Sequence, residues 1–228
     1  MKVSIVIPAH NEAAVIAKTL QAVCALEYPD FEVIVIDNAS SDNTGEIAKK
    51  FPVRVVREDR KGLLHARERG RVEATGDIIA NIDADCLPNK EWLSRMTSQF
   101  TSDDIVAVTG PYDYFDGSKT FRFASLLLQK TVYVFFHAMI RTINKSGVLI
   151  GGNNCIRASV LRDVGGYNTD ILFYGEDTNT AKRISKKGTI VFNTHCVMKT
   201  SARRFQEEGI IKIGAKYFYH FFRETAKN

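Results

Sequence analysis

Over its first 110 residues the sequence alternates between short aliphatic runs and stretches with helical spacing, and this alternation constrains the fold more than any other feature. The aliphatic runs are Val3–Pro8, Phe31–Asp37, Val53–Val56, Asp77–Asp83 and Ile105–Thr109. The helical stretches are Glu12–Cys24, Asn43–Lys50 (with a capping-box pattern, Asn43 and Glu46), Leu63–Ala74 and Asn89–Phe100. Strands that are apolar along their whole length are typical of parallel sheets covered by helices on both faces. We therefore expect an α/β fold with a mostly parallel central sheet.

The alternation fades from about Pro111. The second half predicts an aromatic-rich helix at 121–143, a Gly/Asn turn at 151–154, helices near 158–164, 176–187 and 207–224, and a strand near 189–192. We expect a single domain over 1–228. It divides into a first half with regular alternation (1–110), a second half without it (111–205) and a C-terminal amphipathic helix (206–228).

The net charge and the cysteine pattern limit the kinds of partner and the cellular location that we expect. The chain has 31 basic and 26 acidic side chains, a net charge of +5, which suits a polyphosphate ligand or an anionic membrane surface. No basic block or nucleic-acid-binding signature is present, so we expect no nucleic-acid partner. The four cysteines form no C-x-x-C pair, which argues against a disulfide framework and favours a reducing, cytoplasmic location.

Acidic residues follow the predicted strands, where ligands gather in such sheets. In Asp83-Ala84-Asp85, two carboxylates at i and i+2 leave a strand in the same direction, and oxygen ligands favour Mg²⁺ or Mn²⁺. The alternative is a pair of solvated turn acids. Asp37 ends the second strand, where such a fold holds a ribose or base, but it also suits a helix-entry turn. His195 is either a further metal ligand or a structural histidine.

A second acidic pair, Glu176-Asp177, follows Tyr174-Gly175 and precedes a predicted helix. A carboxylate held against aromatic groups has a raised pKa, which suits a general base. The competing interpretation is that the two acids merely favour the helix N-terminus. The turn after the first strand, from Pro8 to Glu12, lacks G-x-G-x-x-G, which argues against a dehydrogenase.

Together these segments resemble glycosyltransferase family 2, whose members are inverting enzymes with a Rossmann-like GT-A fold. Seven matching strings occur in the family's order: Val6–Glu12, Val35–Ser40, Lys61–Arg67 with Gly70, Asp83–Asp85, Gly151–Asn154, Gly165–Tyr167, and Gly175–Asp177 with Arg183 and Gly188. The resemblance implies a nucleotide-diphosphate sugar donor, a saccharide or lipid-linked acceptor, and Mn²⁺ or Mg²⁺ as cofactor.

The resemblance also implies roles for individual residues. On the donor side it assigns the nucleoside pocket to Pro8, Ala9 and Glu12, the base or ribose to Asp37, the nucleotide to Arg67, the ribose and metal to Asp83, and direct metal binding to Asp85. On the acceptor side it assigns the general base to Asp177, its support to Glu176, and the sugar and acceptor cleft to Gly152 and Asn153.

Two departures from the family pattern bear on the reaction. Thr180 stands where the family usually carries leucine, which leaves the preceding acids in place. The Gln-x-x-Arg-Trp string of processive members is missing, and Ser201–Phe205 occupies that region, which favours a single transfer. Arg203 and Arg204 in this segment suit a phosphate group, because paired guanidinium groups match its geometry. They are equally compatible with solvated basic residues before a helix.

Two other functions compete with a sugar transferase. A nucleotidyltransferase usually has a Gly-rich basic loop after the first strand, which Pro8–Glu12 lacks. A non-catalytic nucleotide-sugar-binding or membrane-associated module has no chemical need for Asp177.

The helix at 121–143 raises the question of membrane contact. No stretch reaches the ~18 uninterrupted apolar residues of a spanning helix, because Gln129, Lys130, His137 and Arg141 interrupt it. We therefore expect a soluble chain. Polar residues from Ser125 to Arg141 form one stripe at i+4 spacing, and apolar residues cover the rest. Such a helix lies on a membrane surface, packs inside the protein or forms a homodimer interface. A peripheral position on the inner face of the cytoplasmic membrane follows from the first of these.

Overall fold

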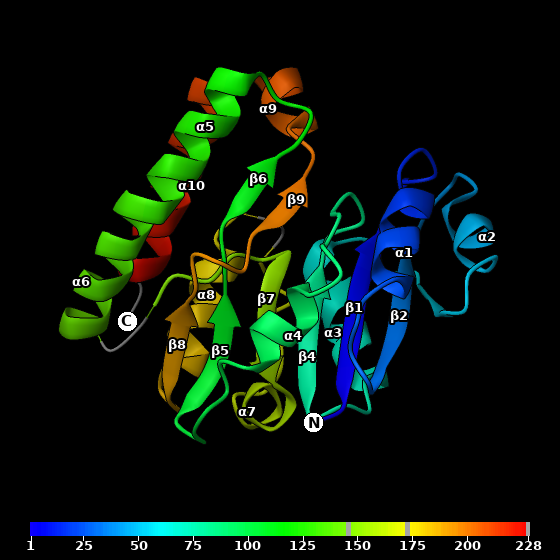
Figure 1. Ribbon diagram of the computed structural model, residues 1–228, viewed down its shortest axis with the longest axis horizontal. Helices are drawn as coiled ribbons and strands as arrows, with labels where there is room; N and C mark the ends of the chain where they lie inside the picture. The colour runs from blue at the N-terminus through cyan, green and yellow to red at the C-terminus, as the bar shows by residue number, and fades with distance from the viewer. Residues whose placement is uncertain (145–146, 172–173, 227–228) are drawn as a thin grey trace.

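The computed structural model describes residues 1–144, 147–171 and 174–226. Within them, a seven-stranded sheet has the order β3-β2-β1-β4-β7-β5-β8 (Figure 1). Its strands are β1 (Val3–Ala9), β2 (Phe31–Asn38), β3 (Arg54–Glu58), β4 (Ile78–Ile82), β5 (Ile105–Thr109), β7 (Asn153–Arg157) and β8 (Thr189–Phe192). All pairings are parallel except those of β7 with its neighbours β4 and β5. The predicted mostly parallel sheet is confirmed.

Helices cover both faces of this sheet, because each central strand presents apolar side chains alternately to either side. Val3, Ile5 and Ile7 share a buried cluster with α1 and α4, whereas Val6 belongs to a second cluster with α3, α7 and α8. The helices on the sheet are α1 (Ile16–Cys24), α2 (Thr44–Ala48), α3 (Leu63–Glu73), α4 (Trp92–Thr97), α7 (Ala158–Asp163) and α8 (Glu176–Ile184).

Several helices are shorter than predicted. Residues 12–15 form a turn before α1, in which the amides of Val15 and Ile16 donate to the Glu12 carbonyl. The predicted capping box is wrong: the Asn43 side chain makes no capping hydrogen bond, and Asp42 Oδ1 accepts from the Thr44 amide instead.

Strand β7 was not predicted, because Asn153 and Asn154 interrupt the apolar pattern that marks a buried strand. Both are buried in the structure, where neighbouring groups satisfy their amides. Asn154 Oδ1 accepts from Asn81 Nδ2 at 2.8 Å, and its own Nδ2 donates to the carbonyls of Ile150 and Gly151. Hydrogen-bonded amides therefore replace apolar packing at this point of the core.

A second layer stands beyond the carboxyl ends of the parallel strands (Figure 1). It contains a small sheet of two parallel strands, β6 (Tyr112–Tyr114) and β9 (Met198–Thr200), which are too short to show a sequence pattern. Its helices are α5 (Lys119–Leu128), the π-helix η1 (Gln129–Tyr133), α6 (Val134–Asn144), α9 (Arg203–Glu208) and α10 (Ile210–Ala226).

The elements α5, η1 and α6 form one continuous helix, which confirms the helix predicted at 121–143. In the part of the chain that the structure describes, Lys119–Thr142 is long and apolar enough to cross a membrane despite its polar interruptions, and its most apolar 18-residue window has a mean hydropathy of 1.4. Only 17% of its most apolar window is buried. Length and composition alone do not separate a membrane span from a helix that lies along a surface.

Candidate active site

Loops that follow β1, β2 and β4 meet the loop that precedes β7 at one edge of the sheet. The reason is the direction of β7: because it is antiparallel, its first residue lies at the carboxyl ends of its neighbours. The register pairs Asn153 with Ile82. Gly151-Gly152 therefore lies beside Asp83, although about 70 residues separate them in sequence.

The Asp83-Ala84-Asp85 motif lies in a turn and not on a strand, so the predicted i, i+2 alignment does not apply. β4 ends at Ile82, and the Cys86 amide donates to the Asp83 carbonyl at 3.0 Å. Burial, followed by the negative charges of Asp83 and Glu12, raises the pKa of Asp85 to about 6. Asp85 is therefore close enough to both acids to be repelled by them.

These acids fit a divalent ion with oxygen ligands, because a cation would relieve their repulsion. Within the described ranges, however, no three His, Cys, Asp or Glu side chains form a group that could hold an ion. His195 is exposed in the turn after β8, where its amide donates to Asn193 Oδ1.

Arg67, on α3, is the buried centre of the site, with only 4% of its side chain exposed. Its Nη2 donates to Asp83 Oδ1 at 3.3 Å, and its Nη1 lies 3.3 Å from Glu176 Oε1 and 3.7 Å from Asp177 Oδ1. Burial opposes the charged form, but the charges of Asp83, Glu176 and Asp177 together raise the pKa of Arg67 above its ordinary value. Arg67 thus joins the two acidic motifs.

The acidic pair Glu176-Asp177 forms the first turn of α8, which starts after Gly175 in the left-handed conformation (φ 89°). Burial, and then the charge of Asp177, raises the pKa of Glu176 well above its usual range, and burial also raises the pKa of Asp177. The side chain of Asp177 is 30% exposed and that of Glu176 only 10%. Of the two, Asp177 is thus the one that an entering molecule can reach.

Gly151 and Gly152 make room for this cluster. A Cβ atom on Gly151 would lie 2.5 Å from Asp177 Oδ1 and 2.7 Å from Arg67 Nη2. A Cβ on Gly152 would lie 2.1 Å from Asp83 Oδ2 and 2.5 Å from the Tyr112 hydroxyl. Any side chain here would displace the charged groups, which explains the Gly-Gly sequence before β7.

The structure corrects the expectation that Asn153 lines the cleft. Its side chain is wholly buried, and it accepts from Trp92 Nε1 at 2.9 Å while donating to the carbonyls of Pro111 and Cys196. All its hydrogen-bonding groups face the protein. Asn153 therefore supports the cleft from behind and does not face a ligand.

The remaining predicted donor-side residues lie along the ends of β1 and β2. Pro8 and Ala9 end β1 and are buried, and Glu12 lies in the following turn. Asp37 Oδ2 accepts from Arg57 Nη1 at 2.9 Å, while its Oδ1 is buried without a hydrogen-bond partner. A cavity of about 390 Å³ adjoins Asp37, lined also by Asp42, Gly45, Glu46, Lys49, Val55 and Arg57.

Arg203 and Arg204 open α9 and are exposed. Arg203 forms a two-pronged pair with Glu12, with Nη2 2.8 Å from Oε1 and Nη1 3.1 Å from Oε2. The C-terminal segment thus reaches across to the turn after β1.

Two residues of the site have no clear sequence signal. The Tyr112 hydroxyl donates to Asp83 Oδ2 at 3.2 Å, and Gln129 holds the Tyr112 backbone by bonding its N–H at 2.8 Å and its carbonyl at 3.0 Å. The only sequence hint was a glutamine inside an otherwise apolar helix. Gln129 is buried, so the polar stripe of that helix faces the protein at this position.

An acidic turn after a central β4 strand, facing a second acidic pair at the start of a helix on a Rossmann-like sheet, defines a GT-A fold. The model of the family described as Glycosyl transferase family 2 matches residues 4–165. The chain belongs to this family.

Relatives and solved structures agree with this assignment. Glycosyltransferase AglE of Haloferax volcanii is 30% identical over 207 residues, which cover 86% of this chain and 65% of that protein. Probable glycosyltransferase YdaM of Bacillus subtilis is 31% identical over 200 residues, covering 82% and 47%. The chain thus spans less than two thirds of either relative.

Two solved structures show the same fold. The mannosyltransferase PcManGT from Pyrobaculum calidifontis, in complex with GDP-Man and Mn²⁺, has a TM-score of 0.77 at 22% identity and covers 100% of this chain and 65% of its own. Glucosyl-3-phosphoglycerate synthase from Mycobacterium tuberculosis, in complex with Mn²⁺, UDP-Glc and phosphoglyceric acid, has a TM-score of 0.64 at 21% identity, covering 100% and 80%.

Proposed function

We propose that this chain is an inverting glycosyltransferase that moves one sugar from a nucleotide-diphosphate donor to a hydroxyl acceptor with the help of Mn²⁺ or Mg²⁺. One observation carries the proposal: Arg67 links Asp83, beside the candidate metal site, to Asp177, the accessible acid of the pair on α8. A transferase needs these two functions on either side of the bond that breaks. Family membership and the donor complexes of the two structural neighbours support the same reaction.

On the donor side, Asp85 and Asp83 would hold the ion, and the donor's phosphate oxygens would supply further ligands. When bound, the ion stabilises the negative charge of the departing diphosphate. Tyr112 and Arg67 orient Asp83 through their contacts at 3.2 and 3.3 Å. Pro8, Ala9, Glu12 and Asp37 border the nucleoside, with the cavity beside Asp37 close by.

On the acceptor side, Asp177 takes the proton from the attacking hydroxyl. Its side chain is the more exposed of the pair, and its buried Oδ1 lies 3.7 Å from Arg67 Nη1, which leaves the rest of the carboxylate to face the acceptor. Burial and the charge of Asp177 raise the pKa of Glu176 well above its usual range, whereas the charge of Arg67 favours the ionised form of Asp177. Attack from the side opposite the leaving diphosphate inverts the anomeric centre.

The test compares Asp177→Asn with Asp163→Asn, a control on the exposed surface of α7. We expect Asp177→Asn to bind the donor with Mn²⁺ as the natural sequence does, measured by calorimetry, but to transfer sugar about 10²–10⁴-fold more slowly. Asp163→Asn should change neither value. Full transfer by Asp177→Asn would overturn the base assignment, and a product of retained anomeric configuration by NMR would overturn inversion.

Single transfer is the second part of the proposal. The segment at 201–205 differs from the processive string, and its Arg203 is engaged with Glu12. Mass spectrometry of products at excess donor should show addition of one sugar per acceptor. A ladder of longer products would contradict this part and leave the transfer chemistry standing.

We further propose that the acceptor is lipid-linked and that the helix from Lys119 to Asn144 rests on a membrane. This helix turns polar side chains toward the domain and apolar ones away from it. Gln129 and His137 are buried against the domain, while Phe123 and Phe135 are 71% and 67% exposed. His137 Nδ1 accepts from the Val148 amide at 3.1 Å. Because its polar side is tied to the domain, we infer that the helix lies in the lipid interface rather than across the bilayer.

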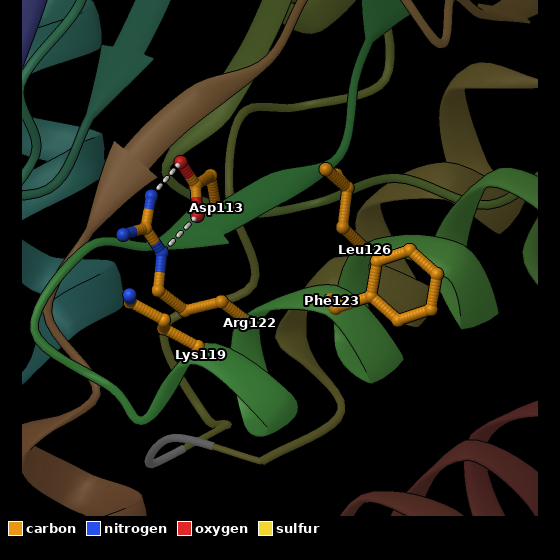
Figure 2. Close-up of a pocket in the computed structure, with 5 residues that line it drawn as sticks. All are labelled: Asp113, Lys119, Arg122, Phe123 and Leu126. Atoms are coloured by element: carbon orange, nitrogen blue, oxygen red, sulfur yellow. Dashed lines mark hydrogen bonds and ion pairs between the residues drawn. The ribbon is translucent and has the colours of Figure 1, made fainter.

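The charges on this helix fit an anionic lipid surface. It contains four basic residues and no acidic one: Lys119, Arg122, Lys130 and Arg141. Near its start lies a hollow of about 270 Å³, in which Figure 2 shows Lys119 beside Arg122 and Phe123 beside Leu126. Arg122 is held by Asp113 through hydrogen bonds of 3.0 and 2.8 Å.

Vesicle flotation tests this position. The protein should float with vesicles that contain anionic lipid, and the double variant Phe123→Ser with Phe135→Ser should bind about tenfold or more weakly. Val72→Ser removes an exposed apolar side chain from α3 and serves as the control. Failure of the natural sequence to float would overturn the membrane position, as would mass photometry showing that the same face joins two copies.

A further inference from the structure

The strongest feature that the proposed reaction does not use is the contact between Arg203 and Glu12. It joins residues 191 positions apart, and it brings the start of α9 over the turn after β1. Its donors and acceptors are arranged as a fork, with two guanidinium nitrogens facing two carboxylate oxygens. The guanidinium also acts electrostatically on Asp85.

The segment that carries Arg203 is firmly held at the corner between β6 and α5. Asp116 accepts from the Ser201 hydroxyl at 2.6 Å and from the Ala202 amide at 2.5 Å. Phe205 packs against Tyr114 and Phe121, with ring centroids 5.1 and 5.3 Å apart. The backbone of α9 is thus fixed, and the exposed Arg203 side chain is the part that can move.

We propose that Arg203 acts as a built-in cation. Until the donor arrives, its guanidinium occupies the part of the donor site in which the divalent ion and the diphosphate would bind. Without donor, its guanidinium neutralises Glu12 and Asp85 and so competes with a divalent ion. With donor bound, the same guanidinium turns from Glu12 to the diphosphate, where two parallel N–H donors match phosphate oxygens. The inference rests on the proposed donor and metal site. It predicts that the ion binds to this site together with the nucleotide rather than before it.

This arrangement predicts opposite effects of one substitution in two states. In Arg203→Gln the competing charge is gone, so Mn²⁺ alone should bind roughly fivefold more tightly. The same variant loses a phosphate ligand, so Mn²⁺ with a nucleoside diphosphate should bind roughly tenfold more weakly. A residue that only supported the fold would weaken both, and a residue without a role would change neither.

The experiment measures free Mn²⁺ by electron paramagnetic resonance during titration of the full chain, without and with uridine or guanosine diphosphate. Arg54→Gln removes an equal charge from a half-exposed residue at the start of β3, the end opposite the site, and should leave both affinities unchanged. Arg203→Lys keeps the charge without the fork, so it should bind Mn²⁺ alone as the natural sequence does.

The outcomes separate this inference from the proposed function. Opposite shifts in the two titrations support it. Equal shifts, or none, in Arg203→Gln overturn it while leaving the metal site intact. Absence of Mn²⁺ binding with either nucleotide in the natural sequence would overturn the proposed metal site and the inference with it. A melting temperature equal to that of the natural sequence would show that Arg203→Gln is folded.

Discussion

Replacing Arg67 by glutamine tests whether one cation holds the two halves of the site together. Arg67 is the partner that Asp83, Glu176 and Asp177 share. Removing one member of a buried ion pair costs about 3–5 kcal/mol, because the remaining charges stay buried without compensation. Since Asp83 is 38% and Asp177 30% exposed, solvent screens part of this loss, and we expect about 3 kcal/mol. For a chain of this size that lowers the melting temperature by roughly 6–12 °C.

The pH dependence of this loss gives the sharper check. The pKa values of Glu176 and Asp177 are already raised in the folded protein, and Arg67 opposes that rise. Without Arg67 they rise further, so the folded variant binds more protons than its unfolded chain. Stability from such acids is present at low pH and lost as pH rises through the folded pKa. The deficit of Arg67→Gln should therefore be larger at pH 8 than at pH 5.5.

Urea unfolding at several pH values measures this deficit, with Arg54→Gln as a surface control that should change stability by less than about 1 kcal/mol. If Arg67→Gln were as stable as the natural sequence at pH 8, or if its loss of stability did not change with pH, Arg67 would not be the cation that stabilises the three acids.

Three further predictions concern the groups around this centre. The pKa of Asp85 is about 6, so the affinity for Mn²⁺ with nucleotide should fall about tenfold per pH unit below 6 and level off above it, as calorimetry would show; a flat profile contradicts the ligand assignment. Gly152→Ala should lower kcat/KM about 100-fold by displacing Asp83, whereas Gly214→Ala, with open space around it, should not; equal activities would refute the close fit. Asn153→Ala should lower the free energy of unfolding in urea by about 3 kcal/mol or more, because three buried groups lose their hydrogen-bond partner. It should leave donor affinity unchanged at low temperature; weaker donor binding by the folded variant would mean that Asn153 does face the cleft.

The sequence predicted the strands whose burial is evident from their own residues. β1, β2, β4 and β5 are nearly continuous apolar runs, broken inside only by Ser4, Glu32 and Asn81, and the burial of most of their residues leaves few alternatives. β7 escaped prediction because its first two residues are asparagines, and their burial depends on partners such as Asn81 and Trp92 far away in the chain. β6 and β9 have three residues each, too few for any periodicity to be visible.

The site shows the same division. Motif order located both acidic pairs, because each directly follows or begins a regular element. The sharing of Arg67 between them was invisible, since Glu176 is 109 residues away and only the folded sheet brings the two together. Asn153 was misjudged for a similar reason: a polar residue next to two glycines is typical of a ligand-binding loop, and only its surroundings show that its amide is fully used inside.

The reversed direction of β7 has a consequence for how this scaffold can diversify. Because β5 ends and β7 begins at the same edge of the sheet, the stretch between them leaves and re-enters the domain at nearly one place. Within this stretch Tyr112 contacts Asp83 and β6 pairs with β9, so these residues tie residues 110–150 to the rest of the site. A change in the length of this stretch is therefore best placed in the turn between β6 and α5 or within the helix that follows it, where the sheet register is unaffected.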